Sequence, residues 1–139
     1  MSKKNKTIYW IATVWLSLGM FATALMQLLK TKAEGAVSPP GVEGIMHLGY
    51  PVYFLTIIGI WKILGTIAVL IPKLPLLKEW AYAGFFFLMT GSIFSHIASG
   101  DPAKELLPSL LLITLIVVSW YYRPADRRLI PANFKLANQ

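Results

Sequence analysis

Four long stretches almost free of charge constrain the fold of this chain more than any other feature. They lie at positions 8–29, 51–71, 80–98 and 106–122. A helix needs about 20 apolar residues to cross the ~30 Å hydrocarbon core of a bilayer, and about 17 is enough. Inside lipid, an α-helix satisfies its backbone hydrogen bonds within one segment. The pattern therefore predicts an all-α protein, a four-transmembrane-helix bundle.

The expected helices form a single integral membrane domain, residues 1–139, with the fourth helix gaining a turn from the segment before it. Their predicted limits are about 8–29, 51–71, 80–98 and 102–122. The first apolar run continues beyond the usual length of a signal-peptide core, so we expect an anchor and not a cleaved leader. Residues 30–50 are expected to form an outer loop, with the apolar part 42–48 lying over the mouth of the bundle.

Composition supports this class. Hydrophobic residues make up 56% of the chain and charged residues 14%, against roughly 45–50% and about 25% in soluble domains. The chain has no cysteine, which excludes disulfides, thiolate metal sites and thiol redox chemistry by the chain itself. Any redox role would have to come from a cofactor.

Basic residues predict the orientation, because cytoplasmic flanks of membrane helices are enriched in lysine and arginine. The termini and the connection after the second helix carry most of them: Lys3, Lys4, Lys6, Lys73, Lys78, Arg123, Arg127, Arg128 and Lys135. The other two connections carry Lys30, Lys32 and Lys104. Both termini are therefore expected in the cytoplasm. The net charge of +7 indicates attraction to anionic lipid, and no nucleic-acid partner is expected because no soluble basic face exists.

Small and polar residues recur at helical spacing and predict the faces that meet, since membrane helices pack through such residues. The expected inward stripes are Thr13, Ser17, Ala24 and Gln27; Gly59, Lys62 and Thr66; and Gly84, Gly91 and Ser95 with Ser92 and His96 beside them. Phe85 to Leu88 and residues 110–118 are expected toward lipid. Asp101 is expected to cap the fourth helix, with Pro102 at its first position, and Pro108 to kink it.

Lys62 is the one charged residue between Pro51 and Ile71. It lies about 16 Å below the start of the second helix, where a charge costs at least about 2.5–3.5 kcal/mol. Two readings remain open. In one, Lys62 contacts a ligand. In the other it is structural, and its ammonium extends toward carbonyls or hydroxyls of neighbouring helices or pairs with Glu43 or Asp101 descending from the outer connections.

A cluster of polar groups above Lys62 suggests a cavity that opens outward or sideways. The expected ligand-binding residues are Lys62, His96, Tyr50, Tyr53, Gln27 and Thr66. His96 either exchanges a proton or hydrogen bond with a ligand, or is bonded to a carbonyl at the interface. Glu43, His47, His96 and Asp101 have no metal-ligand spacing, so no metal site is expected. No phosphate loop, serine elbow or paired catalytic carboxylate is visible.

Five ordered motifs resemble the DoxX-like family, small four-helix membrane proteins of bacteria. They are LGYP at residues 48–51, IGIWKILG at 58–65, LKEWAYAGFFF at 77–87, SHIASGD at 95–101 and WYYRP at 120–124. The positions that match the family pattern are Tyr50, Pro51, Lys62, Glu79, Trp80, His96 and Asp101. The resemblance implies the four-helix bundle, a bacterial inner-membrane location and, through its best-understood relatives, a subunit of a quinone-linked membrane oxidoreductase.

The sequence thus favours a small membrane protein that binds a lipophilic, quinone-like ligand within the bundle and serves a membrane oxidoreductase. One alternative is an assembly subunit without chemistry, in which Lys62 pairs with an acid on a partner protein. A weaker one is an anion transporter that works as a homodimer. Quinone is the one cofactor considered, and lipid is an expected partner in every case.

Overall fold

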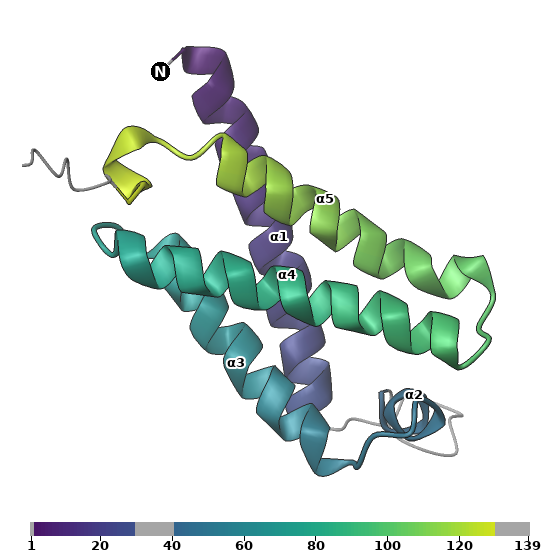
Figure 1. Ribbon diagram of the computed structural model, residues 1–139. Coiled ribbons are helices and arrows are strands. Elements are labelled where there is room, and N and C mark those ends of the chain that lie inside the picture. Colours follow the sequence, from purple (N-terminus) through teal and green to yellow (C-terminus); the bar gives the residue numbers. More distant parts are fainter. Residues whose placement is uncertain (1, 30–40, 130–139) are drawn as a thin grey trace, which may run out of the picture.

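The computed structural model describes residues 2–29 and 41–129, and its regular elements are all helical. Four helices are long and apolar enough to cross a membrane, which confirms the predicted class. The elements, drawn in Figure 1, are α1 (Lys3–Leu29), α2 (Val42–His47), α3 (Tyr53–Leu70), α4 (Pro75–Ala98), the 3-10 helix η1 (Ala103–Leu106), α5 (Leu107–Tyr121) and the 3-10 helix η2 (Ala125–Arg127).

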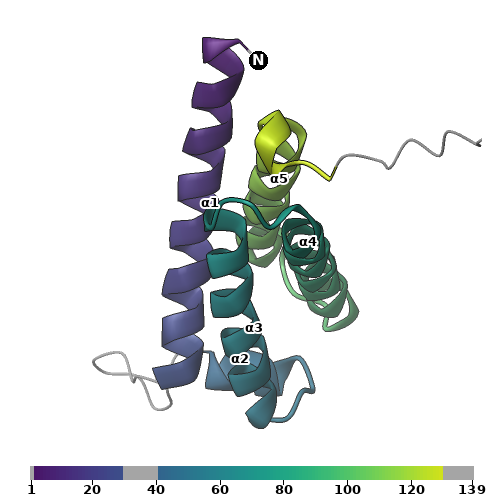
Figure 2. The same ribbon diagram turned by 90° about the vertical axis from the view of Figure 1, so that its left-hand side faces the viewer.

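The long helices pack in a ring in which α1 contacts α3 and α5, and α4 contacts the same two helices. The α4–α5 hairpin crosses the α1–α3 pair obliquely (Figures 1 and 2). The short helix α2 lies at one end of the bundle, together with the turn that follows α4; we call this the α2 end. The start of α1 and residues 122–129 lie at the opposite end, the terminal end. The side of the membrane on which each end lies stays a prediction.

The centre of the bundle combines an apolar cluster with a chain of hydroxyl groups. Tyr82 and Ser119 are joined at 2.7 Å, Ser119 and Thr13 at 2.7 Å, and Thr13 donates to the carbonyl of Tyr9 at 2.6 Å. These hydrogen bonds connect α4, α5 and α1 through hydroxyl groups to which lipid could offer no hydrogen-bond partner. The apolar cluster around it comprises Leu16, Met20, Val69, Tyr82, Phe85, Met89 and Ile116.

The predicted inward faces of α1 and α3 are buried, apart from the half-buried Gln27. The prediction for α4 was partly wrong. Thr13, Ser17, Ala24, Gly59, Lys62 and Thr66 are buried. On α4, however, Gly84 and Gly91 are exposed, and Phe85, expected toward lipid, is buried. The reason lies on α3: a Cβ at Gly65 would meet the Phe85 ring at 2.7 Å, so that ring fills the space beside Gly65. The small residue that permits the α3–α4 contact is on α3.

The start of α4 also differs from the prediction. The helix begins at Pro75, so Lys78 belongs to its first turns and is 0% exposed. Its ammonium donates to the carbonyls of Ala68 and Val69 at 2.8 Å, and to that of Ile71. These carbonyls close the last turn of α3, where no amide of the helix remains to bind them. Lys78 is therefore a buried cap for α3 and not a loop charge.

A second buried cation reinforces this cap. Arg127 donates to the carbonyls of Val69 and Leu70, at 3.3 and 3.2 Å, and to the hydroxyl of Tyr9 at 3.3 Å. The residues after α5 are thereby fixed against the end of α3. Positive charge at a helix C-terminus is also favoured by the helix dipole.

The segment before α5 corrects two further expectations. Pro102, not Asp101, precedes η1, and no side chain caps this helix. Pro108 lies in the first turn of α5, where a missing amide hydrogen costs nothing, so it starts the α-helix and does not kink it. Asp101 makes other contacts, described below.

Candidate functional site

A cavity of about 380 Å³ lies at the α2 end between α1, α3 and α4. α2 covers part of it through Gly44 and Ile45, followed by Leu48. Most of the lining is apolar, and the polar side chains that line it are Gln27, Tyr50, Lys62, Ser92, Ser95 and His96. This volume and this mixture are typical of small-molecule sites.

Lys62 comes from the middle of α3 and is 5% exposed. Its ammonium donates to the Oγ1 of Thr23 at 3.2 Å. That hydroxyl donates onward to the carbonyl of Gly19 at 2.8 Å, so it is free to accept from Lys62. Within the described residues, Lys62 forms no ion pair, although an ammonium carries three donors. The cavity wall thus holds a cation whose charge and donors are only partly matched.

Gln27 and Tyr50 line the cavity nearer the α2 end. The Oε1 of Gln27 is buried and has no hydrogen-bond partner among the described residues. Tyr50 shares a hydrogen bond of 2.9 Å with Ser95, which donates to the carbonyl of Gly91. The ring of Tyr50 also stacks on Phe54 with centroids 5.1 Å apart. Tyr50 is therefore held in place, whereas the side-chain oxygen of Gln27 can accept a hydrogen bond from a ligand.

His96 is bonded to a carboxylate, and not to the carbonyl that was one of the two alternatives for it. Its Nδ1 lies 2.6 Å from one oxygen of Asp101, and the Nε2 of His47 lies 2.6 Å from the other. This His47–Asp101–His96 bridge ties α2 to the end of α4. His47 has a side chain that is 56% exposed, whereas that of Asp101 is 13% exposed. Among the described residues, the ion pairs of Asp101 are with these two histidines, and none joins the carboxylate to Lys62.

The structure brings four of the six predicted site residues together: Gln27, Tyr50, Lys62 and His96 line one cavity. Tyr53 does not line it, and its side chain is 66% exposed. Thr66 is buried a turn below and donates to the carbonyl of Lys62 at 2.8 Å. Sequence reasoning missed Thr23, although it lies four residues before Gln27 and so shares its helical face. The described residues contain no group of three side chains arranged to hold a metal ion.

An apolar groove of about 650 Å³ adjoins the cavity and runs between α3 and α4. Four residues line both: Phe54, Ile58, Lys62 and Leu88. Of the described residues, Lys62 is the only charged one that lines the groove. The cation therefore lies where a polar cavity and an apolar groove meet.

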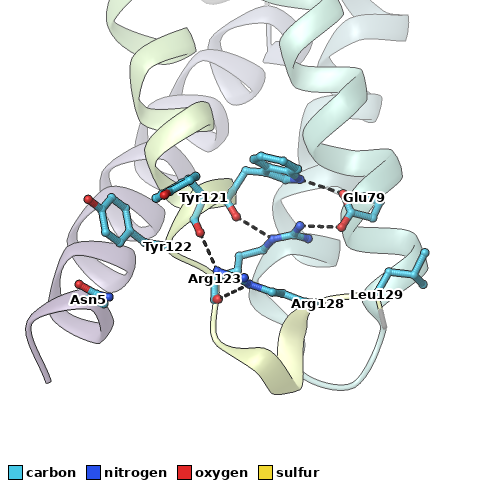
Figure 3. A pocket seen from close by; sticks show the side chains of 8 residues that line it. Asn5, Glu79, Tyr121, Tyr122, Arg123, Arg128 and Leu129 are labelled. Carbon is cyan, nitrogen blue, oxygen red and sulfur yellow. Dashed lines mark hydrogen bonds and ion pairs between the residues drawn. The ribbon is translucent and has the colours of Figure 1, made fainter. Parts of the chain in front are cut away.

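A third pocket, of about 500 Å³, lies at the terminal end (Figure 3). Its charged side chains bind each other and nearby carbonyls. Glu79 accepts from Arg123 at 2.6 Å and from the indole of Trp120 at 2.9 Å, which joins α4 to the end of α5. Arg128 donates to the carbonyls of Arg123 and Tyr121, both at 2.7 Å. We interpret this pocket as the outer surface of a structural clamp.

The profile of the DoxX-like family matches residues 11–119. The chain belongs to this family. The match extends from α1 to near the end of α5, and includes Lys62, Glu79, His96 and Asp101. No curated protein and no solved structure matches the chain significantly. Together with the four apolar helices, family membership establishes a small multi-pass integral membrane protein.

The bridge at the α2 end predicts a dependence on pH in this DoxX-like protein. Hydrogen bonds from His96 and then His47 hold the pKa of Asp101 below its ordinary value. The stabilisation is therefore fully present above the unfolded pKa, about 3.9, and is lost as the pH falls through the lower folded pKa.

We expect Asp101→Asn to lower the thermal unfolding midpoint at pH 7, and the difference from wild type to shrink below about pH 3.9. Asp126→Asn is the control, since Asp126 is exposed at the opposite end. Tryptophan fluorescence during heating, from pH 3 to pH 7, measures the unfolding midpoints of both variants and of wild type. A difference that is the same at every pH would contradict the carboxylate bridge.

Proposed function

We propose that this protein binds a lipophilic, quinone-like ligand in the α2-end cavity, within the bacterial inner membrane, and serves a membrane oxidoreductase there. The observation that carries the proposal is Lys62, a buried cation that lines the cavity without a carboxylate partner among the described residues. Ionisable residues inside membranes commonly mark ligand or ion sites.

The energetics favour an acceptor beside Lys62. Placing this charge near mid-membrane costs at least about 2.5–3.5 kcal/mol, and a single neutral hydroxyl at 3.2 Å offsets only part of that cost. A carbonyl or other electron-rich oxygen on a ligand would accept from the remaining donors. Charge-assisted hydrogen bonds of this kind are roughly twice as strong as neutral ones.

Other groups in the cavity suit a ligand head with both acceptor and donor atoms. His96 is bound to Asp101 through Nδ1, which leaves its Nε2 for the ligand. The Oε1 of Gln27, which has no partner in the described part of the chain, can accept a hydrogen bond from the ligand. A quinone head offers carbonyl acceptors, and its reduced form offers hydroxyl donors, so the same cavity serves both forms.

The decisive test is binding by Lys62→Met protein in lipid nanodiscs. A benzoquinone with a decyl chain is the probe, and quenching of tryptophan fluorescence is the readout. We expect binding at least about tenfold weaker, the equivalent of 1.4 kcal/mol. Lys104→Met is the control, because Lys104 is exposed and does not line the cavity. Binding unchanged by Lys62→Met would exclude the proposed head site.

A second candidate function has one observation in its favour. Lys62 also lines the groove on the α3–α4 face, where an acid on a partner helix could reach it. In that case the protein is an assembly subunit. A larger complex would then co-purify from native membranes and be lost with Lys62→Met, whereas a purified protein that retains a small molecule in mass spectrometry supports the first proposal.

A further inference from the structure

We infer that the apolar groove between α3 and α4 holds the hydrocarbon chain of the molecule whose polar head lies beside Lys62. The ligand class is then an amphiphile with one compact head and one long apolar chain, and it enters sideways from the bilayer. This inference rests on the proposed function, because it assumes that a head occupies the cavity.

Continuity between the two spaces is the first argument. The cavity and the groove share Phe54, Ile58, Lys62 and Leu88, so they adjoin along one side of α3. Their chemistry changes across this boundary. The cavity side offers Tyr50, Ser95 and His96, among others. Along the groove, Lys62 is the only charged residue within the described ranges. The order of polar and apolar lining matches the order of head and chain in one molecule.

The length and direction of the groove give the second argument. Along α3 the groove is lined from Phe54 to Ile71, and the part beyond Lys62 is about 14 Å long at 1.5 Å per residue. On α4 it is lined as far as Leu77 and Trp80, near the terminal end. An extended chain that starts beside Lys62 would therefore point toward the terminal end and stay within the ~30 Å hydrocarbon layer.

The shape of this path distinguishes a chain from a helix of a second copy. A helix is about 10 Å across with its side chains, and it cannot pass from the groove into the cavity beside Lys62. A small head on a flexible chain can. Because lipid is as apolar as the groove, the chain gains little by leaving the bilayer. Its role is to select and orient the ligand by fit, so the test must be steric.

Two exposed glycines of α4 allow such a test. Gly84 lines only the groove and Gly91 lines only the cavity. A Cβ at either position would meet nothing within 4 Å, so a leucine side chain begins in open space at each of them. Leucine is also the better helix former. Gly84→Leu and Gly91→Leu are thus a matched pair that differs in the space they fill.

Binding is measured in nanodiscs with a benzoquinone that lacks a chain and with the same head carrying a decyl chain. We expect Gly84→Leu to weaken binding of the decyl compound about tenfold and to leave the chainless compound unchanged. Gly91→Leu should weaken both. If Gly84→Leu leaves both unchanged, the groove does not hold the chain, although the head site stands. If wild type binds neither compound, the proposed function itself fails.

A photolabel removes any dependence on the variants. A diazirine placed at the end of the decyl chain should label residues 67–81, and mass spectrometry of peptides locates it. Labelling confined to α1 or α5 would overturn the inference. A second copy in the groove would instead show as a dimer in nanodiscs that Gly84→Leu dissociates, with binding of the decyl compound unchanged, and this outcome also overturns it.

Discussion

Lys78→Met is expected to reduce the free energy of unfolding by about 3–5 kcal/mol, because three carbonyls at the end of α3 lose a cationic donor. Hydrogen bonds to charged groups contribute about 1.5–3 kcal/mol each, and a buried acceptor left without a partner costs about 1–3 kcal/mol. Arg127 still reaches Val69 and Leu70, so the loss is smaller than a sum over all bonds. Methionine keeps the length of the buried side chain, so the cavity it leaves is small.

Lys73→Met is the matched control for this prediction. Lys73 is exposed in the turn between α3 and α4, and its removal takes the same charge from the same end of the bundle. Any effect on membrane orientation should therefore appear in both variants. Unfolding by SDS titration of protein in bicelles compares them. Equal midpoints for the two variants would contradict the buried cap.

Sequence reasoning placed Lys78 in a connection and interpreted it as an orientation signal, because basic residues near helix ends usually have that role. The turn between α3 and α4 is shorter than expected, since α4 begins at Pro75. This places Lys78 against the last turn of α3, where carbonyls outnumber amides. No property of the lysine itself distinguishes this role from a surface charge. The distinction depends on how two helix ends meet.

The four spans and the faces of α1 and α3 were predictable for a physical reason. Lipid imposes a length and excludes charge, so hydrophobic runs mark the helices directly. Small and polar residues then mark the contact between α1 and α3. A Cβ at Gly59 would lie 2.8 Å from Leu28 and 3.3 Å from the carbonyl of Ala24, which shows how closely the helices approach there. Lys62 lies one turn further along the same face.

The details of the candidate site were less predictable because they join distant residues. His47 and Asp101 are separated by 54 positions and meet only because α2 folds back over the bundle. The inward face of α4 was predicted wrongly because large rings, Phe85 among them, pack against the neighbouring helices, and the glycines of α4 stay exposed. Periodicity indicates a face, but the choice between a ring inside and a glycine inside depends on the partner helix.

The clamp at the terminal end gives the second large prediction. Arg123 is 3% exposed, and Glu79 is the carboxylate that balances it, as Figure 3 shows. Removing one partner of a buried pair costs about 3–5 kcal/mol. Glu79 is 30% exposed, so we expect Glu79→Leu to cost about 2–4 kcal/mol. Asp126→Leu, which removes an exposed acid at the same end, should cost far less in the same SDS titration.

A double variant separates the charge from the packing. In Glu79→Leu the cation stays buried against the rings of Tyr82 and Trp120 without a carboxylate. Glu79→Leu with Arg123→Met removes both charges, and apolar replacement of a buried ion pair is often neutral or stabilising. The double variant should therefore be more stable than Glu79→Leu alone. If the two changes simply add, the clamp stabilises through separate contacts, and the unbalanced cation is not the cause of the loss.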